Sequence, residues 1–174
     1  MPLSVYLLTV LLISLVIRCG NRSNGSHNLS QKEMKEPLIQ ENILITQEES
    51  RTIDRFIERH EWKMEQTGNG LRYMILEKGP GIKAETGMQA TVEYEIRLLD
   101  GTLCYSSLEK GPRKFLIGKD NVESGIHEGI TLLHVGDKAK FILPSYLAHG
   151  LSGDNNKIPP RSSLVVDLKL LRLD

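Results

Sequence analysis

The chain contains few cysteines and has no excess of positive or negative charge. Its only cysteines are Cys19 and Cys104, which cannot supply the four ligands of a structural zinc site and are too few for a disulfide-scaffolded miniprotein. Lys plus Arg and Asp plus Glu number 22 each in 174 residues. With zero formal net charge no global positive field attracts a nucleic acid, which argues against general nucleic-acid binding. Stability must therefore come from packing of the 40% hydrophobic residues.

The common motifs of catalysis are also missing from the sequence. It contains no glycine-rich phosphate loop, no cluster of cysteine and histidine with zinc spacing, and no nucleophile elbow. His127 and His134 lie seven residues apart, but no carboxylate stands at a spacing that would complete a metal site. We interpret both as ordinary helix residues and expect no metal. The sequence is typical of a chemistry that needs neither a nucleophile nor a metal.

An uncharged apolar run occupies residues 2–17 and has about the length of the apolar region in a signal peptide. It is shorter than the roughly 20 residues of a typical membrane-spanning helix. We therefore expect residues 1–18 to direct export. Cys19 lies two residues after the run, and a cysteine at this place resembles the lipobox of bacterial lipoproteins, although Ile17 and Arg18 stand where small residues are usual.

Acylation of Cys19 would attach the protein to a membrane of the cell envelope, in the periplasm or at the outer membrane. Two alternatives stay open, namely a cleaved soluble secretory protein and an uncleaved signal anchor. From residue 19 to 45 the sequence is mainly polar and predicts a flexible tether, because such a segment buries too little apolar surface to offset its ordering entropy.

An amphipathic helix is predicted over residues 46–66. Thr46 and Glu49 have the spacing of a capping box, and the apolar residues Ile53, Ile57 and Met64 recur at helical intervals. The turn-forming residues 67–70, Thr-Gly-Asn-Gly, then end the helix.

After Gly70 the hydrophobic pattern changes from helical to alternating. The segments that predict short strands are residues 71–77, 90–99, 113–117, 139–143 and 163–173. Asp100-Gly101 between two apolar strands predicts a hairpin. A single short helix is predicted over residues 122–133, where Gly125 and Gly129 would allow close approach to a sheet. We expect an α+β domain over residues 70–174.

Several stretches of this region resemble one known family. In order they are VEYE at 92–95, LDGT at 99–102, YSS at 105–107, FLIGK at 115–119, VESGIHEGI at 122–130, VGDKAK at 135–140, LPSYLAHG at 143–150, KIPP at 157–160 and LVVDLKLL at 164–171. Their order and spacing are similar to those of the FKBP-type peptidyl-prolyl cis-trans isomerases. The resemblance implies a curved antiparallel sheet wrapped around one short helix, with a proline pocket between them and no cofactor. The preceding helix, the tether and Cys19 are similar to membrane-anchored bacterial members, including a gliding-motility-associated lipoprotein branch.

The resemblance also implies which residues build the pocket. Tyr94 is placed on a pocket wall, and Val122 and Ile158 keep apolar positions. Glu123 stands where the backbone amide of an isoleucine often binds the substrate carbonyl, and any side chain except proline keeps that N–H. Cys104 stands where a wall ring is expected, and we interpret it as a small buried strand residue.

Other pocket positions depart from the family pattern. Ile126 replaces the tryptophan of the pocket floor, and Val166 replaces a phenylalanine of the last strand. Tyr105 replaces an acidic residue, and Arg113 replaces a wall aromatic. His149 replaces a tyrosine whose hydroxyl donates a hydrogen bond, and His149 could donate in its place. Together with the wall residue Tyr94 and with Tyr105, it completes the set of candidate catalytic residues. For Tyr105 and His149 the alternative is that they simply fill a loop surface.

The expected function is peptidyl-prolyl isomerisation that assists the folding of exported, proline-containing polypeptides. The expected mechanism is desolvation of the amide in the pocket together with twisting of its bond. The alternative is a binding or chaperone module that keeps the fold without turnover. The thinned pocket favours this alternative, because each lost ring removes roughly 150 to 250 Å² of contact surface. The sequence leaves the oligomeric state open.

Overall fold

The computed structural model describes residues 31–174. The expectations for the signal peptide, for Cys19 and for residues 19–30 of the tether lie outside the described residues. Residues 41–174 form one compact unit, which contains the sheet and the candidate site. Within residues 31–174 no helix is both long enough and apolar enough to cross a membrane. The same residues contain no cluster of three or more His, Cys, Asp or Glu side chains arranged to hold a metal ion.

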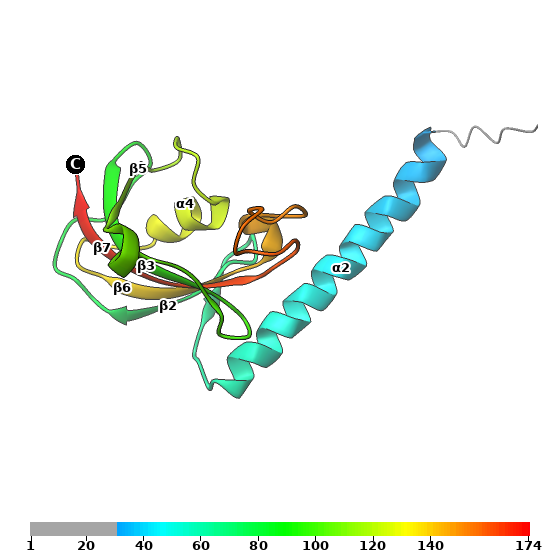
Figure 1. Ribbon diagram of the computed structural model, residues 1–174, viewed down its shortest axis with the longest axis horizontal. Coiled ribbons are helices and arrows are strands. Elements are labelled where there is room, and N and C mark those ends of the chain that lie inside the picture. Colours follow the sequence, from blue (N-terminus) through cyan, green and yellow to red (C-terminus); the bar gives the residue numbers. More distant parts are fainter. Residues whose placement is uncertain (1–30) are drawn as a thin grey trace, which may run out of the picture. The chain divides into compact units, whose positions relative to one another are not determined.

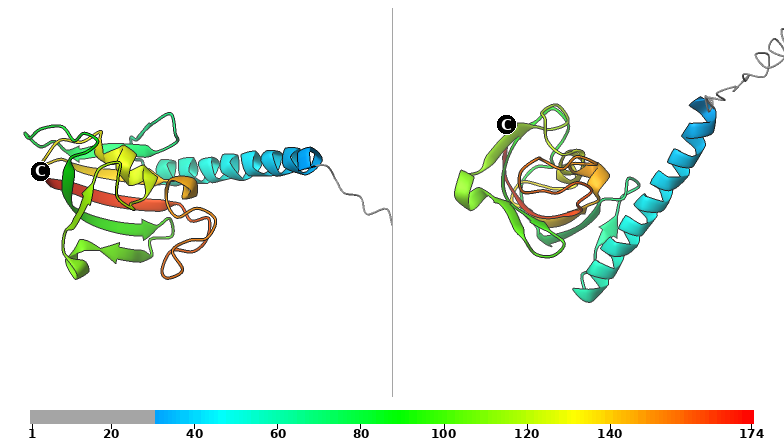
Figure 2. Two further views of the ribbon diagram at one scale, coloured as in Figure 1. Left: turned by 90° about the horizontal axis from the view of Figure 1, so that it is seen from above. Right: turned by 45° about the vertical axis from the view of Figure 1, so that its right-hand side comes forward.

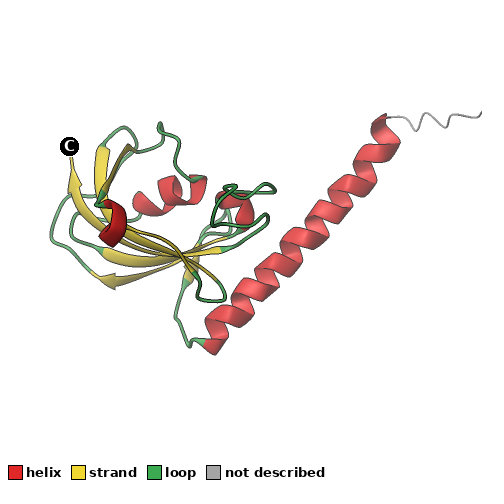
Figure 3. Cartoon of the chain, in the orientation of Figure 1, coloured by secondary structure: helices red, strands yellow, loops and turns green. Residues whose placement is uncertain are grey.

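The described elements alternate between short strands and a few helices (Figures 1 and 3). In chain order they are α2 (Gln31–Arg59), β1 (Glu65–Gln66), β2 (Arg72–Glu77), β3 (Gln89–Leu98), β4 (Leu103–Ser106), α3 (Ser107–Lys110), β5 (Arg113–Leu116), α4 (Ser124–Ile130), β6 (Lys138–Leu143), the 3-10 helix η1 (Ser145–Leu147) and β7 (Leu164–Leu173). The strands form one antiparallel sheet in the order β1-β2-β6-β7-β3-β4, with β5 paired to β3. This confirms the expected α+β class.

The inner face of the sheet is the face that packs against α4, and it forms the main core. Figure 2 shows the sheet curving around α4. Inward side chains alternate along each strand, and Phe141 of β6 and Val166 of β7 are both fully buried. A Cβ atom added at Gly125 would lie 2.7 Å from Cγ of Leu143, and one at Gly129 would lie 2.9 Å from Cε1 of Phe141. The glycines therefore allow the close approach of α4 that the sequence predicts.

The outer face is the opposite face of the sheet, and part of it is covered by the second half of α2. Ile53 and Phe56 of α2 pack against Ile142 of β6 and Val165 of β7, which forms a second small core. Helical spacing places Ile53 and Phe56 on the same side of α2, and this side is the apolar stripe seen in the sequence. The amphipathic pattern is thus explained by burial against the sheet.

Two charged side chains, Arg72 and Glu49, join the second half of α2 to the sheet and its loops by hydrogen bonds. The buried Arg72 of β2 donates to Ser50 Oγ at 2.6 Å and to Asp54 Oδ1 at 2.9 Å. The carboxylate of Glu49 accepts hydrogen bonds from Ser145 N at 2.6 Å, Ser145 Oγ at 3.0 Å and Ser163 Oγ at 2.7 Å. Charge-assisted hydrogen bonds of this kind are stronger than neutral ones. Glu49 therefore ties α2 to both ends of the segment between β6 and β7.

The predicted bounds of the helix and tether are wrong. The helix spans Gln31–Arg59, not residues 46–66, so residues 31–45 are helical where a flexible tether was expected. The polarity of residues 31–45 suggests a tether, but their helix propensity favours a helix. They are rich in Glu, Gln, Lys and Leu, which are good helix formers. Thr46 is inside the helix, where its hydroxyl donates to the carbonyl of Asn42, and Glu49 contacts the segment after β6 in place of a cap.

The end of the helix follows from local backbone geometry. Glu61 has a φ of 55°, and Trp62 N donates to the carbonyl of Ile57. This reversal brings the Trp62 ring over Lys140 of the sheet, with 4.9 Å from Nζ to the ring centroid.

The predicted strands are confirmed to within about two residues, and the Asp100-Gly101 hairpin joins β3 to β4 with Gly101 at a φ of 91°. The predicted helix 122–133 is shorter, because only Ser124–Ile130 is α-helical.

Candidate functional site

A narrow apolar pocket lies between α4 and the inner face of the sheet. Its lining residues are Val92, Tyr94, Ile96, Arg113, Phe115, Val122, Glu123, Ile126, Val166 and Leu168. The free volume is about 20 Å³, which is roughly the room that one water molecule occupies. The pocket is therefore a small slot in which side chains already fill most of the space.

The strand period explains how three residues of one strand reach the same pocket. Val92, Tyr94 and Ile96 alternate along β3 and project from one face. Val166 lies opposite Ile96 in the β3–β7 register, and Leu168 lies opposite Tyr94. Cross-strand neighbours on one face are in contact distance, so the pocket wall is continuous across the two strands.

Three polar side chains from three different segments meet at the edge of the pocket. Glu123 precedes α4, and its Oε1 lies 3.1 Å from Nε2 of His149, in the loop after η1. Its Oε2 lies 3.6 Å from Nη1 of Arg113 on β5, which is beyond hydrogen-bond distance, and this oxygen is buried without a hydrogen-bond partner among the described residues. We call Arg113, Glu123 and His149 the rim cluster. It stands where the family pattern has aromatic and aliphatic residues, at three of the departures identified in the sequence.

Tyr105 is held away from the pocket by a second polar group. Its hydroxyl donates to Asp154 Oδ2 and accepts from Nδ2 of Asn156 at 3.2 Å. The hydrogen bond with Asp154 raises the pKa of Tyr105, and burial adds to the rise. Lys110 and Lys157 lie near the Tyr105 ring, with their Nζ atoms 4.8 and 5.5 Å from its centroid. Tyr105 is thus fixed by its neighbours and is not a lining residue.

His127 on α4 anchors the loop that leads into the pocket. Its Nδ1 accepts from Gly118 N at 2.9 Å, and its Nε2 lies 3.0 Å from the carbonyl oxygen of Asp120. This pair of contacts requires the neutral ring with its proton on Nε2. The ring also packs edge-on against Phe115 with 5.7 Å between centroids. His127 is therefore a structural brace, which refines its interpretation as an ordinary helix residue.

The structure places most of the predicted pocket residues together. Those that line the pocket are Tyr94, Val122, Glu123, Ile126 and Val166. Ile158 is buried in the main core and does not line the pocket, and His149 reaches it only through Glu123. The pocket also contains Val92, Ile96, Phe115 and Leu168, which are not among the predicted site residues. Their inward positions on alternating strands are a signal that identifies all four, since Leu168 lies two residues after Val166 on β7.

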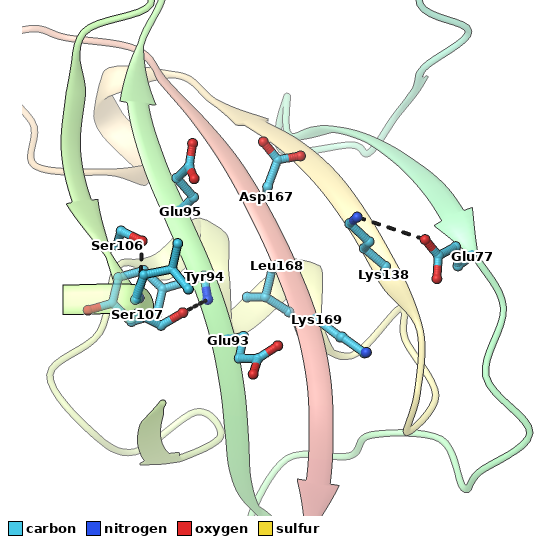
Figure 4. A pocket seen from close by; sticks show the side chains of 11 residues that line it. Glu77, Glu93, Tyr94, Glu95, Ser106, Ser107, Lys138, Asp167, Leu168 and Lys169 are labelled. Atoms are coloured by element: carbon cyan, nitrogen blue, oxygen red, sulfur yellow. Dashed lines mark hydrogen bonds and ion pairs between the residues drawn. The ribbon is translucent and has the colours of Figure 1, made fainter. Parts of the chain in front are cut away.

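A larger depression of about 390 Å³ lies on the outer face of the sheet (Figure 4). Its charged lining residues are Glu77, Glu93, Glu95, Lys138, Asp167 and Lys169. Lys138 pairs with Glu77 at 3.8 Å across it, and Asp167 pairs with the neighbouring Lys140. The Lys138–Glu77 pair is exposed, and such pairs contribute little free energy.

The Cys104 thiol is fully buried, and burial raises its pKa. Because the thiolate is the reactive form, we expect this thiol to be inert in the folded protein. In the Cys19→Ser variant, where Cys104 is the single thiol, iodoacetamide should modify the chain only after it is unfolded by guanidinium. Modification of Cys104 at equal rates in folded and unfolded protein would contradict its burial.

Asp154 is expected to make the stability of its loop depend on pH. Burial alone would raise the pKa of Asp154, but hydrogen bonds from Tyr105, Ile158 N and Asn156 N together lower it. A lowered folded-state pKa contributes stability that is present above the ordinary value and is lost as pH falls through the folded one. The stability difference between wild type and Asp154→Asn should therefore be larger at about pH 7 than at about pH 3. Urea unfolding measures it, and a difference independent of pH would contradict the account.

The fold is similar to that of a solved isomerase. A peptidyl-prolyl cis-trans isomerase structure from Pseudomonas syringae superposes on this chain with a TM-score of 0.63 at 25% sequence identity. The match covers 74% of this chain and 96% of that chain. The antiparallel sheet curved around one short helix, with a pocket between them, is therefore an FKBP fold.

The sequence comparisons narrow this class to a family. The sequence profile of the FKBP-type peptidyl-prolyl cis-trans isomerases matches residues 81–171, just over half of the chain, and the chain belongs to this family. Peptidyl-prolyl cis-trans isomerase Fkbp12 of Drosophila melanogaster is 41% identical over 91 residues, which cover 52% of this chain and 84% of that protein. Probable FKBP-type peptidyl-prolyl cis-trans isomerase FkpA of Neisseria meningitidis is 41% identical over 108 residues, 62% of this chain. The matched part spans only 39% of the Neisseria protein.

Proposed function

We propose that residues 70–174 catalyse cis-trans isomerisation of X-Pro peptide bonds in polypeptides. The observation that carries the proposal is the apolar pocket in which Tyr94, Val122, Ile126 and Val166 converge. Family membership supports the same activity. Of the lining residues, Tyr94, Arg113 and Val122 are partly exposed, so movement of these side chains admits a prolyl ring.

The proposed mechanism uses desolvation and requires no covalent step. Rotation about a peptide bond faces a barrier of about 18 to 20 kcal/mol, because resonance gives the C–N bond partial double-bond character. An apolar pocket disfavours the charge-separated resonance form and so favours the twisted amide. Each 1.36 kcal/mol of such differential stabilisation raises the rate about tenfold.

One hydrogen-bond donor at the pocket is available to the substrate. Within residues 31–174 the backbone N–H of Glu123 makes no hydrogen bond, and it can donate to the carbonyl that precedes the proline. Tyr94 supplies a wall ring. In this proposal His149 acts as a rim wall, since its Nε2 is directed to Glu123. Tyr105, which donates to Asp154, shapes the neighbouring loop.

The alternative function is binding without turnover, as a chaperone module. Two observations favour it, namely the small free volume of the pocket and the occupation of His149 by Glu123. Isomerisation assays separate the two functions. A module that suppresses aggregation of an unfolded protein but does not accelerate isomerisation would support the alternative.

The activity test compares two substitutions on β3. Tyr94→Ala removes a pocket wall, and Glu93→Ala is the control, because Glu93 is exposed on the outer face. In a protease-coupled assay with an X-Pro peptide panel, we expect kcat/KM to fall about tenfold for Tyr94→Ala and to stay unchanged for Glu93→Ala. Activity should survive chelators and Cys104→Ser. Equal activity of Tyr94→Ala and wild type would place the reaction elsewhere, and a wild type without acceleration on any peptide would refute it.

We also propose that the protein is exported and anchored through an acylated Cys19, as in membrane-anchored bacterial members of the family, and assists the folding of exported proteins. The support is the uncharged apolar run at residues 2–17 that ends two residues before Cys19. A palmitate analogue should label the wild type in a bacterial host and not Cys19→Ser. Equal labelling of both would contradict the lipid anchor. An unlabelled soluble wild type would support ordinary signal cleavage.

A further inference from the structure

The rim cluster puts charge beside a pocket that is otherwise apolar, and its charges differ in how accessible they are. The side chain of Arg113 is 39% exposed, whereas that of Glu123 is only 11% exposed. Both Glu123 oxygens also face cationic or N–H groups, with His149 Nε2 on one side and Arg113 Nη1 on the other. The charge that a bound peptide can reach is therefore the guanidinium of Arg113.

Arg113 also keeps hydrogen-bonding capacity for a ligand. A guanidinium has five N–H donors in a planar fork that matches a carboxylate. Among the described residues the Arg113 side chain makes one hydrogen bond, a long contact of 3.4 Å from Nη2 to the carbonyl of Asn121. Its distance of 3.6 Å from Glu123 leaves that ion pair loose. Most of the fork is therefore open to an incoming carboxylate.

Charged groups of both signs lie around Tyr105. Lys110 and Lys157 lie near the Tyr105 ring and form no salt bridge within residues 31–174. Asp154 accepts from Tyr105, Asn156 N and Ile158 N, and Asp120 accepts from Leu116 N, and both carboxylates keep their negative charge. A charge preference at the pocket therefore rests on Arg113 and not on the groups around Tyr105.

We propose that Arg113 is a specificity-determining residue that selects X-Pro segments with an acidic side chain before the proline. This inference rests on the proposed isomerase function. A carboxylate at this place pairs with the fork of Arg113, whereas a lysine at the same place meets like charge. An aliphatic residue gains neither contact and must desolvate the guanidinium, which disfavours it.

The test compares acetylated peptides Ala-Xaa-Pro-Phe-amide, with Glu, Gln, Leu or Lys as Xaa, by exchange NMR at low ionic strength. For the wild type we expect kcat/KM for the Glu peptide to exceed that for the Lys peptide about fivefold, which fits the modest energy of a partly exposed ion pair. The ratio should shrink as salt is added, because salt screens exposed charges.

Variants of neighbouring residues identify the source of the preference. Arg113→Gln should bring the Glu-to-Lys ratio below one, because Glu123 then carries the remaining charge of the rim cluster. Glu123→Gln should raise the ratio above that of the wild type. The matched control is Lys114→Gln, which removes the same charge from the exposed side of β5 and should leave the ratio unchanged.

Each outcome distinguishes this inference from the proposed function. Acceleration of all four peptides by the wild type without a charge preference overturns the role of Arg113 and leaves the isomerase intact. An equal fall of the ratio in Arg113→Gln and Lys114→Gln also overturns it, because the preference would then come from net charge. No acceleration of any peptide, including the uncharged Gln and Leu peptides, overturns the isomerase function and this inference with it.

Discussion

Replacing Phe56 with alanine is expected to lower the free energy of unfolding by about 3 to 5 kcal/mol, as other buried Phe to Ala changes do. The Phe56 side chain is only 6% exposed and closes the small core between α2 and the outer face of the sheet. Its ring also meets the Trp62 ring edge-on, with 5.6 Å between centroids. Since a domain is typically stable by about 5 to 15 kcal/mol, this loss is a large fraction of the total.

The control for this prediction lies on the same helix. Leu44 is 65% exposed, and Leu44→Ala removes an apolar side chain that makes no comparable burial. Its effect should stay within about 0.5 kcal/mol. Denaturant unfolding of both variants followed by far-ultraviolet circular dichroism gives the two values. Equal losses for Phe56→Ala and Leu44→Ala would show that α2 is not docked through Phe56.

Replacing Gly129 with leucine is expected to cost about 3 kcal/mol of unfolding free energy, the upper part of the usual range for overpacked cores. A Cβ atom at this position would lie within 3.0 Å of two carbons of the Phe141 ring. That ring is fully buried in the middle of the inner face and cannot move aside. The leucine must therefore push α4, and with it Ile126, away from the sheet.

Two further variants test the cause of this loss. Nothing lies within 4 Å of a Cβ atom at Gly68, so Gly68→Leu is the matched control and should be nearly neutral. The double variant Gly129→Leu/Phe141→Ala should lose less unfolding free energy than the two single variants lose together, because removing the ring makes room for the leucine. Strict additivity would mean that the clash with Phe141 is not the reason.

The strands and the inner-face walls of the site were predictable because they depend on local patterns. Alternation along β3 and β7 is visible in the sequence and places Tyr94 and Val166 on the inner face. The Asp100-Gly101 hairpin is equally local. Family resemblance supplied the pocket positions on α4, where Ile126 lines the pocket as expected. Local patterns of a few residues can be recognised in a sequence without knowing which distant segments the fold brings into contact.

The errors concern residues whose conformation depends on distant partners. Glu49 has the spacing of a cap, yet its carboxylate binds Ser145 and Ser163, which follow it by 96 and 114 residues. His149 was predicted to be either a hydrogen-bond donor at the rim or part of a loop surface, and its contact with Glu123 was not predicted. Such long-range polar pairs leave no period in a sequence. They could be found only once the fold had brought the segments together.

The most direct test of the central claim is to follow backbone amide chemical shifts while a Glu-Pro peptide is added to residues 41–174, the compact unit of the structure. If proline segments bind in the inner-face pocket, the largest shifts should occur at Tyr94, Glu123, Ile126 and Val166. Amides on the outer face, such as Glu93 and Asp167, should change least. Shifts confined to the outer-face depression, or none at saturating peptide, would contradict the account.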